Sequence, residues 1–220
     1  MTTKPFDRRV ADALVRALYD TPVSPSQVTT AALLVGLAAA GSYAAGYAQL
    51  GALLFVASAI LDHADGQLAQ AQGTTSWVGH VYDRVTELVV KIALFAGMGA
   101  GLRHGPYGWW MLAAGAIAGV AFVSIFLARG ARARRIGQTV LAPPSAGPFE
   151  LEDVLYLIVP LTWAGWLEPF LLAAAIGAPI FAAWSLWKLW NTPVPLRSAV
   201  PPPAAFARRS EEVGEPLAAP

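Results

Sequence analysis

The sequence predicts an all-α polytopic membrane protein with six transmembrane helices and an N-terminal amphipathic helix at the membrane interface. Three observations support this fold class. Hydrophobic residues make up 56% of the 220 residues and charged residues only 13%, whereas soluble domains carry about 25% charged residues. Six apolar stretches approach the length of about 20 residues that a helix needs to cross a bilayer. Most Lys and Arg residues gather in alternate connecting segments, which indicates that those segments are cytoplasmic.

Residues 1–27 precede the first apolar stretch and form the predicted interfacial segment. Between Pro5 and Asp20, apolar residues recur near helical spacing, and most charged residues fall on other faces. This pattern is typical of a helix that lies in the membrane interface. An amphipathic helix packed on the bundle would show the same pattern, so both interpretations stay open. We expect no cleavable signal peptide here, because the segment has no apolar stretch of signal length.

Residues 28–191 form the predicted transmembrane domain. The six spans run approximately over Val28–Ala48, Leu50–Ala71, Trp77–Leu102, Tyr107–Ala128, Phe149–Trp166 and Pro169–Trp190. The breaks between them coincide with residues that favour turns, at Gly46, Gly73, Gly105–Pro106, Pro143–Pro144 and Gly165. Such short connections leave little room for a separate domain.

The Lys and Arg residues orient the predicted bundle. Twelve of the 15 lie before the first span, between the fourth and fifth, or at and after the end of the sixth. If the spans alternate, both termini are cytoplasmic, in what we expect to be a bacterial or archaeal cell membrane. Residues 192–220 are rich in Pro and Ala and predict a disordered tail. A net charge of +1 argues against a nucleic-acid partner, and the absence of Cys excludes disulfides and thiolate sites.

Four acidic residues fall inside the second and third predicted spans: Asp62, Asp65, Asp83 and Glu87. A charged side chain at membrane depth costs about 2.5–3.5 kcal/mol even on the lenient insertion scale, so such residues normally face a polar cavity and serve a function. Spacings of three and four residues place each pair on one face of its helix. A short turn at residues 73–75 joins the two helices, which predicts antiparallel neighbours with both acid pairs in their cytoplasmic halves.

Four facing carboxylates cannot all stay ionised without counter-charge, so either some are protonated or cations lie among them. Oxygen ligands suit Mg²⁺ or Mn²⁺, and one or two such ions would suit phosphoryl-type displacement. Gly66, Ala69 and Gly79 extend the acidic faces and leave room for a diphosphate or a flat base near the backbone. His63 and His80 are turned about 100° from the neighbouring Asp on a regular helix, which favours packing roles. A buried polar network that joins two helices is the structural alternative.

The stretch 62–87 resembles the signature of the CDP-alcohol phosphotransferases, also called CDP-alcohol phosphatidyltransferases, which is D-x-x-D-G-x-x-A-R-x8-G-x-x-x-D-x-x-x-D. The matching positions hold Asp62, Asp65, Gly66, Ala69, Gly79 and Asp83, and the spacer has the required eight residues. Gln70 replaces the Arg of the signature, and Glu87 replaces its final Asp. Residues 24–29 resemble the Pro-Asn-x-x-Thr segment before the family's first span, with Ser26 in place of Asn. The six-span layout is also similar.

This resemblance implies an enzyme of phospholipid biosynthesis. It would use Mg²⁺ or Mn²⁺ to move a phosphatidyl or related phosphoalcohol group from CDP-diacylglycerol, or another CDP-alcohol, to a small alcohol or phosphorylated alcohol, and would release CMP. By position in the signature, the metal ligands would be Asp62, Asp65, Asp83 and Glu87. Glu87 would also be the catalytic base for the acceptor hydroxyl. The residues that shape the cytidine and diphosphate pocket would be Gly66, Ala69, Gln70 and Gly79. The resemblance further implies a homodimer in the lipid bilayer.

Two other functions stay open. Gln70 lacks the fixed positive charge of Arg near the phosphates, and Glu87 moves its carboxylate by one methylene, so the chain could be an impaired relative that binds nucleotide or partners. A cation or proton transporter could also use the acid cluster, although after Lys91 the third span has only apolar and small residues. The sequence does not identify the acceptor. Four arginines between the fourth and fifth spans could bind its phosphate or lipid headgroups: Arg129, Arg132, Arg134 and Arg135.

Overall fold

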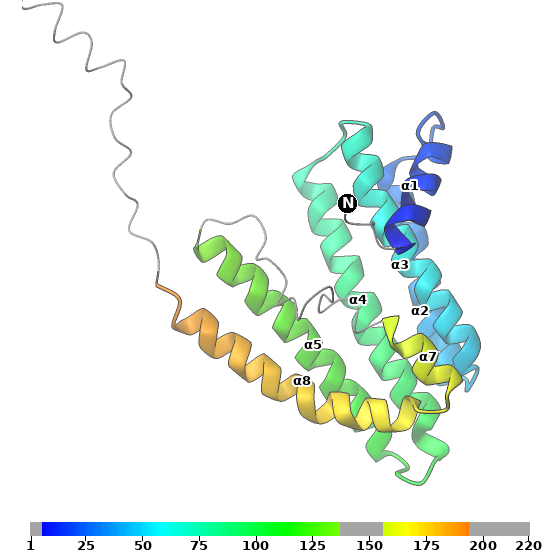
Figure 1. Cartoon of the computed structure of the whole chain (residues 1–220), viewed down its shortest axis with the longest axis vertical. Coiled ribbons are helices and arrows are strands. Elements are labelled where there is room, and N and C mark those ends of the chain that lie inside the picture. Colours follow the sequence, from blue (N-terminus) through cyan, green and yellow to red (C-terminus); the bar gives the residue numbers. More distant parts are fainter. Residues whose placement is uncertain (1–5, 137–155, 194–220) are drawn as a thin grey trace, which may run out of the picture.

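The computed structural model describes residues 6–136 and 156–193, with side chains from residue 10 onward. Every element in these ranges is a helix, which confirms the predicted all-α class. In chain order they are α1 (Phe6–Leu18), α2 (Pro25–Ala44), α3 (Ala48–Ala71), α4 (Trp77–Gly101), the short 3₁₀ helix η1 (Leu102–His104), α5 (Trp110–Arg135), α7 (Ile158–Trp163) and α8 (Leu167–Trp190). Figure 1 shows α2, α3 and α4 bundled together, while α5 and α8 form a pair that diverges from α4.

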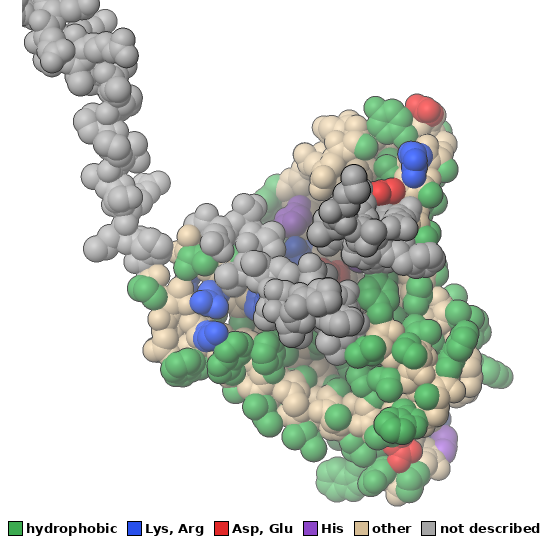
Figure 2. Space-filling view, viewed as in Figure 1, with side chains coloured by type: hydrophobic (Ala, Val, Ile, Leu, Met, Phe, Trp, Pro, Cys, Tyr) green, Lys and Arg blue, Asp and Glu red, His purple; other side chains and the backbone are tan. Residues whose placement is uncertain are grey.

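The described helices have the character of membrane spans. Four segments are long and apolar enough to cross a membrane: α2, Trp77–His104, α5 and α8. Large apolar side chains on their outer faces are exposed, among them Leu34, Ile117 and Ile180. Figure 2 shows hydrophobic side chains over much of one face and few charged ones. The protein is therefore an all-α membrane protein.

Two of the six predicted spans are not among these four. The second corresponds to α3, which has 24 residues but carries polar side chains in its C-terminal half. The fifth predicted span falls partly on residues 149–155, which lie outside the described residues, and α7 occupies its later part. The predicted tail lies almost wholly outside the described residues. The helix expected near the N-terminus is present as α1, which packs against α3, and its placement at a membrane interface stays a prediction.

Local signals fix the starts of α2 and α4. Ser24 caps α2: its hydroxyl accepts a hydrogen bond from the Gln27 backbone N–H at 3.4 Å, while the Gln27 side chain accepts one from the Ser24 N–H at 2.9 Å. This reciprocal capping box is a strong helix-start device. Ser76 caps α4 by accepting from the Gly79 N–H at 3.0 Å. Gly73, with φ of +64°, reverses the chain between α3 and α4, because a residue with a side chain is strained there.

Helices α3 and α4 are held together mainly through α2. They are antiparallel and joined by a short turn, but each packs mainly against α2, and they contact one another little. A Cβ atom on Gly36 of α2 would lie 2.8 Å from Ser58 Oγ of α3 and 2.6 Å from Val90 Cγ1 of α4. The predicted antiparallel hairpin is therefore present, with α2 as the main packing partner of both helices. Gly36 of α2 meets a residue of each helix at once, so α2 packs closely against both.

The half of the bundle distant from the acidic residues is closely packed through glycines. A Cβ on Gly97 of α4 would lie 2.3 Å from the Ala40 carbonyl oxygen, and one on Gly101 would lie 2.0 Å from that of Tyr43. On α5, a Cβ on Gly115 would lie 2.3 Å from the Phe95 carbonyl oxygen. No side chain fits at these distances, so α4 is in backbone contact with both α2 and α5 at this end. Such small-residue contacts are typical of helix association in membranes.

Candidate metal centre between two cavities

Three of the four predicted acids meet in the structure. Asp62 and Asp65 of α3 and Asp83 of α4 each offer a carboxylate oxygen, and these oxygens lie within 4.8 Å of one another. Asp65 is only 3% exposed, and its Oδ2 has no hydrogen-bond partner among the described residues. A buried polar atom without a partner is costly. A divalent cation among the three carboxylates would satisfy it, so the donor set fits Mg²⁺ or Mn²⁺.

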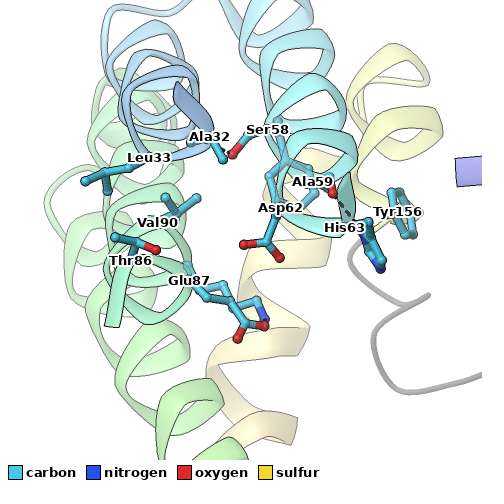
Figure 3. A pocket seen from close by; sticks show the side chains of 12 residues that line it. Ala32, Leu33, Ser58, Ala59, Asp62, His63, Thr86, Glu87, Val90 and Tyr156 are labelled. Atoms are coloured by element: carbon cyan, nitrogen blue, oxygen red, sulfur yellow. Dashed lines mark hydrogen bonds and ion pairs between the residues drawn. The ribbon is translucent and has the colours of Figure 1, made fainter. Parts of the chain in front are cut away.

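Glu87 is not part of this group of three. It lies one turn further along α4, where its carboxylate pairs with Arg84 Nη1 at 3.2 Å and with Lys91 Nζ. Figure 3 shows Glu87 on α4 and Asp62 on α3 extending toward the same cavity. Both cations come from the same helix as Glu87, at spacings of three and four residues, which is the spacing that lets side chains meet on a helix. The role of Glu87 as a further metal ligand stays a prediction.

A cavity of about 770 Å³ opens beside Asp65 and Asp83. Its walls come from the start of α2, the end of α3 and the start of α4. All four residues that the sequence predicts for the nucleotide pocket line it: Gly66, Ala69, Gln70 and Gly79. A Cβ on Gly66 would meet nothing within 4 Å, so at this position the α3 backbone itself forms the cavity wall.

The starts of α2 and α4 both belong to this larger cavity. Their capping residues Ser24 and Ser76 line it, as does Thr29. Helix N-termini present unpaired N–H groups and the positive end of the helix dipole. The cavity therefore combines small residues, hydroxyl groups and two positively polarised helix ends with the carboxylates of Asp65 and Asp83. With a cation to balance these two acids, the combination favours an anionic ligand.

A second, smaller cavity of about 90 Å³ lies deeper in the bundle (Figure 3). Asp62, Glu87 and Lys91 line it together with Ser58 and Thr86, and the remaining lining is largely apolar. Asp62 thus faces the smaller cavity, while Asp65 and Asp83 face the larger one. The group of three carboxylates stands between the two cavities.

Lys91 is the residue that sequence reasoning missed. It is 8% exposed, and its ammonium lies 5.1 Å from the ring centroid of Phe126 and 5.6 Å from that of Phe122, both on α5. Arg84 also lies over Phe126, at 4.5 Å. The signal was available, because Glu87 and Lys91 stand at the i,i+4 spacing of a helical ion pair.

The histidines near the acids do not join the group of three carboxylates. His63 Nδ1 lies 2.8 Å from the Ala59 carbonyl oxygen of its own helix, in agreement with a packing role, and it lines the smaller cavity. His80 lines the larger cavity. A purely structural polar network is a poor description of the site, because Arg84 and Lys91 pair with Glu87 and not with the three aspartates.

Two of the arginines that follow the fourth predicted span cap another helix. Arg132 Nε donates to Thr192 Oγ1 at 3.0 Å, and Arg135 Nη1 donates to the Leu189 carbonyl oxygen at 2.9 Å. Leu189 lies in the last turn of α8, where carbonyl groups lack intrahelical partners and cations are favoured, and Thr192 lies two residues after the end of that helix. These two side chains therefore join α5 to α8 in this structure.

Comparison with solved structures agrees with this fold. The phosphatidylinositol phosphate synthase of Mycobacterium tuberculosis with CDP-DAG bound has a TM-score of 0.69 at 20% identity, over 87% of this chain and all of that one. The same protein in complex with manganese and citrate has a TM-score of 0.68 at 19% identity, over 83% of this chain and 90% of that one. At this level of identity the likeness concerns the fold alone.

Sequence comparison identifies the family. A curated relative, the bifunctional IPC transferase and DIPP synthase of Rubrobacter xylanophilus, is 34% identical over 102 residues, which are 46% of this chain and 23% of the relative. The match thus spans less than a quarter of that relative's length. The family model for CDP-alcohol phosphatidyltransferase matches residues 23–189, a range that holds the three clustered aspartates, the whole lining of the smaller cavity and all but two residues of the lining of the larger one. With most of its length covered by that model, the chain belongs to the CDP-alcohol phosphatidyltransferase family.

Proposed function

We propose that the protein transfers a phosphatidyl or related phosphoalcohol group from a CDP-linked donor to an alcohol acceptor, with release of CMP and in dependence on Mg²⁺ or Mn²⁺. CDP-diacylglycerol is the favoured donor, because a site among membrane helices suits a lipid substrate. The observation that carries the proposal is the buried, unpartnered oxygen of Asp65 within a group of three carboxylates beside a large polar cavity.

The larger cavity suits the CDP part of the donor. Its volume of about 770 Å³ falls within the range of about 300–1,000 Å³ that small-molecule sites occupy. Gly66 lets a ligand approach the backbone, and the N-termini of α2 and α4 favour the negative charge of a diphosphate. These helix ends supply part of the positive potential that Gln70, which replaces the family's Arg, does not supply.

The metal ligands in this proposal are Asp62, Asp65 and Asp83. A divalent ion bound there would neutralise phosphate charge and stabilise the charge that develops on the transferred group. Glu87, in the smaller cavity, would take the proton of the acceptor hydroxyl at its carboxylate. Attack and departure in phosphoryl transfer are roughly in line. Placing the nucleotide and the acceptor in cavities on opposite sides of the carboxylates meets that requirement.

The arrangement in the membrane is also part of the proposal. We infer that α3 and residues 149–166 complete six spans, that α1 lies at the cytoplasmic interface, and that both termini are cytoplasmic in a bacterial or archaeal cell membrane. The distribution of Lys and Arg supports this orientation. A homodimer is the proposed assembly, and the exposed apolar faces of the helices suit contact with lipid or with a second copy.

The test of this function is CMP release by the purified protein. CDP-diacylglycerol and water-soluble CDP-alcohols would be supplied with Mg²⁺ or Mn²⁺ and a panel of free and phosphorylated alcohols. CMP should appear with at least one pair of substrates, and only when metal is present. The Asp65→Asn variant should lose at least as much rate as the roughly 10–100-fold that removal of an outer partner of a metal ligand costs, because it removes a ligand itself. CMP release that survives both chelation and Asp65→Asn would contradict the proposed site.

Two measurements separate the alternatives. If the chain is an impaired relative, the double change Gln70→Arg and Glu87→Asp should create CMP release that the parent protein lacks. If it is a transporter, reconstituted vesicles should show cation or proton flux. The far half of the bundle counts against transport, because Gly97 and Gly101 bring α4 into backbone contact with α2 there and leave little room for a path between these two helices.

A further inference from the structure

The carboxylate of Glu87 is held by two cations of its own helix. Arg84 approaches it from one turn before and Lys91 from one turn after. Its side chain is 15% exposed and that of Lys91 is 10% exposed, so this ion pair is largely removed from solvent. A buried ion pair is strongly destabilised when one partner is removed, and Glu87 is therefore not free to change partners without cost.

Helix α5 supports the same two cations. The Phe126 ring faces both the Arg84 guanidinium and the Lys91 ammonium, and the Lys91 ammonium also lies over the Phe122 ring. Cations over aromatic faces gain additional attraction, more so when they are desolvated. The position of Lys91 is thus set by Glu87 on its own helix and by two rings of the neighbouring helix.

Lys91 also acts on the carboxylates that would hold a metal ion. Asp62 and Asp83 each lie within electrostatic range of both Glu87 and Lys91. If all are ionised, the four acids and the two cations Arg84 and Lys91 carry a formal net charge of minus two. One divalent ion balances that charge, whereas two would leave an excess of positive charge in a poorly solvated interior, which is unfavourable.

We propose that Lys91 is a resident counter-ion that occupies Glu87 and limits the site to one tightly bound divalent cation, held by Asp62, Asp65 and Asp83. This inference rests on the proposed function, because it concerns the metal site of the proposed reaction. Lys91 is a positioning residue in this account. It sets the place and the charge of Glu87 and does not itself touch the transferred group.

The experiment counts bound Mn²⁺ in the purified full-length protein. Electron paramagnetic resonance reports free Mn²⁺ during a titration that extends well above the dissociation constant of the first ion. The protein should bind one Mn²⁺. The Lys91→Met variant leaves Glu87 paired with Arg84 alone and changes the formal charge of the site from minus two to minus three. Two ions then leave no more uncompensated charge than one, so this variant should bind two. Lys91→Arg, which keeps the charge, should bind one.

A matched control comes from α8. Lys188 lies 3.8 Å from the centroid of Trp184 on the same helix, so Lys188→Met also removes a positive charge and a cation–π contact, but away from the carboxylates. It should still bind one Mn²⁺. If Lys91→Met does not fold, Lys91→Gln provides a polar alternative that also removes the charge, and a count of two ions in the unchanged protein would overturn the inference without any variant.

Two tight ions in the unchanged protein would overturn the inference, and so would a single ion in a folded Lys91→Met or Lys91→Gln variant. These outcomes are distinct from failure of the proposed function. Two ions together with CMP release would refute the role of Lys91 alone. One ion without CMP release for any substrate pair would refute the reaction and leave the counter-ion role standing. No bound Mn²⁺ at all would overturn both.

Discussion

Replacing Asp83 by Asn should make the metal-free protein more stable and should remove its stabilisation by metal. Asn keeps the size of the side chain and removes its charge. In the absence of a cation, Asp62, Asp65 and Asp83 repel one another, because their carboxylate oxygens lie within 4.8 Å. The site would then carry a cost in folding stability that only the bound ion offsets, as is common where a protein trades stability for function.

The magnitude follows from Coulomb's law. Two unit charges 4.8 Å apart repel by about 3.5 kcal/mol at an effective dielectric constant of about 20. Asp83 has two such neighbours, neither farther away than this, so Asp83→Asn removes at least about 7 kcal/mol of repulsion when all three acids are ionised. Proton uptake by the cluster relieves most of this in the unchanged protein. We therefore expect the free energy of unfolding to rise by about 1–3 kcal/mol, or the Tm by roughly 2–12 °C.

Thermal unfolding in detergent, followed by Trp fluorescence, measures the effect in chelator and in Mn²⁺. Mn²⁺ at 100 times its dissociation constant should stabilise the unchanged protein by about 2.7 kcal/mol and Asp83→Asn by much less. The control is Asp20→Asn, at an exposed position in the turn after α1, which should change neither value appreciably. A metal-free Tm below that of the unchanged protein, or an undiminished Mn²⁺ shift in Asp83→Asn, would refute the reasoning.

Three further predictions concern the cavity and the packing of the bundle. Gln70→Arg should lower the KM for a CDP-linked substrate about tenfold, because a hydrogen bond to a phosphate is stronger from a charged guanidinium than from an amide. Initial-rate kinetics at a fixed acceptor concentration measure this KM. An unchanged KM would mean that the phosphates bind away from residue 70. Gly101→Ala should lower the free energy of unfolding by about 1–3 kcal/mol, because its Cβ would lie 2.0 Å from the Tyr43 carbonyl oxygen. The control Gly41→Ala, whose Cβ would meet nothing within 4 Å, should not destabilise the protein. Equal Tm values for the two variants would contradict the close contact at Gly101. Tyr43→Phe should lower the free energy of unfolding by about 1–3 kcal/mol, because the buried Thr162 hydroxyl loses its hydrogen bond with the Tyr43 hydroxyl, which lies 3.0 Å away. An unchanged Tm would show that this hydrogen bond contributes little to stability.

The site was largely predictable from local spacing. Asp62 and Asp65 share a face because they are three residues apart, and the turn at Gly73 returns the chain so that Asp83 meets them. The small residues that line the larger cavity follow the same faces. The pairing of Glu87 was not foreseen, although the i,i+4 spacing to Lys91 indicated it. Hydropathy reasoning treated Lys91 as one cation among those within a span and did not ask which acid it contacts.

The packing of the helices was less predictable. In a chain this rich in Ala and Gly, small residues occur on several faces of each helix, so periodicity does not identify the face that meets a neighbour. The packing of α2 against both α3 and α4 depends on Gly36 meeting Ser58 and Val90 at once. Such a contact requires the surfaces of three helices to fit one another, which the pattern along one helix does not reveal. Likewise, the arginines between the fourth and fifth predicted spans indicate how the bundle is oriented in the membrane. Their spacing does not show that Arg132 and Arg135 would bind the C-terminal end of α8.

The glycine contacts at the far end of α4 divide the protein into a part that tolerates substitution and a part that does not. At positions 97, 101 and 115 an added Cβ atom would lie 2.0–2.3 Å from a carbonyl oxygen of a neighbouring helix, so the helices must move apart to admit a side chain. The walls of the larger cavity carry no such restriction at Gly66, where added atoms would meet open space. Members of such a family can therefore acquire new substrates by exchanging residues at one end of the bundle while the other end preserves the alignment of the helices.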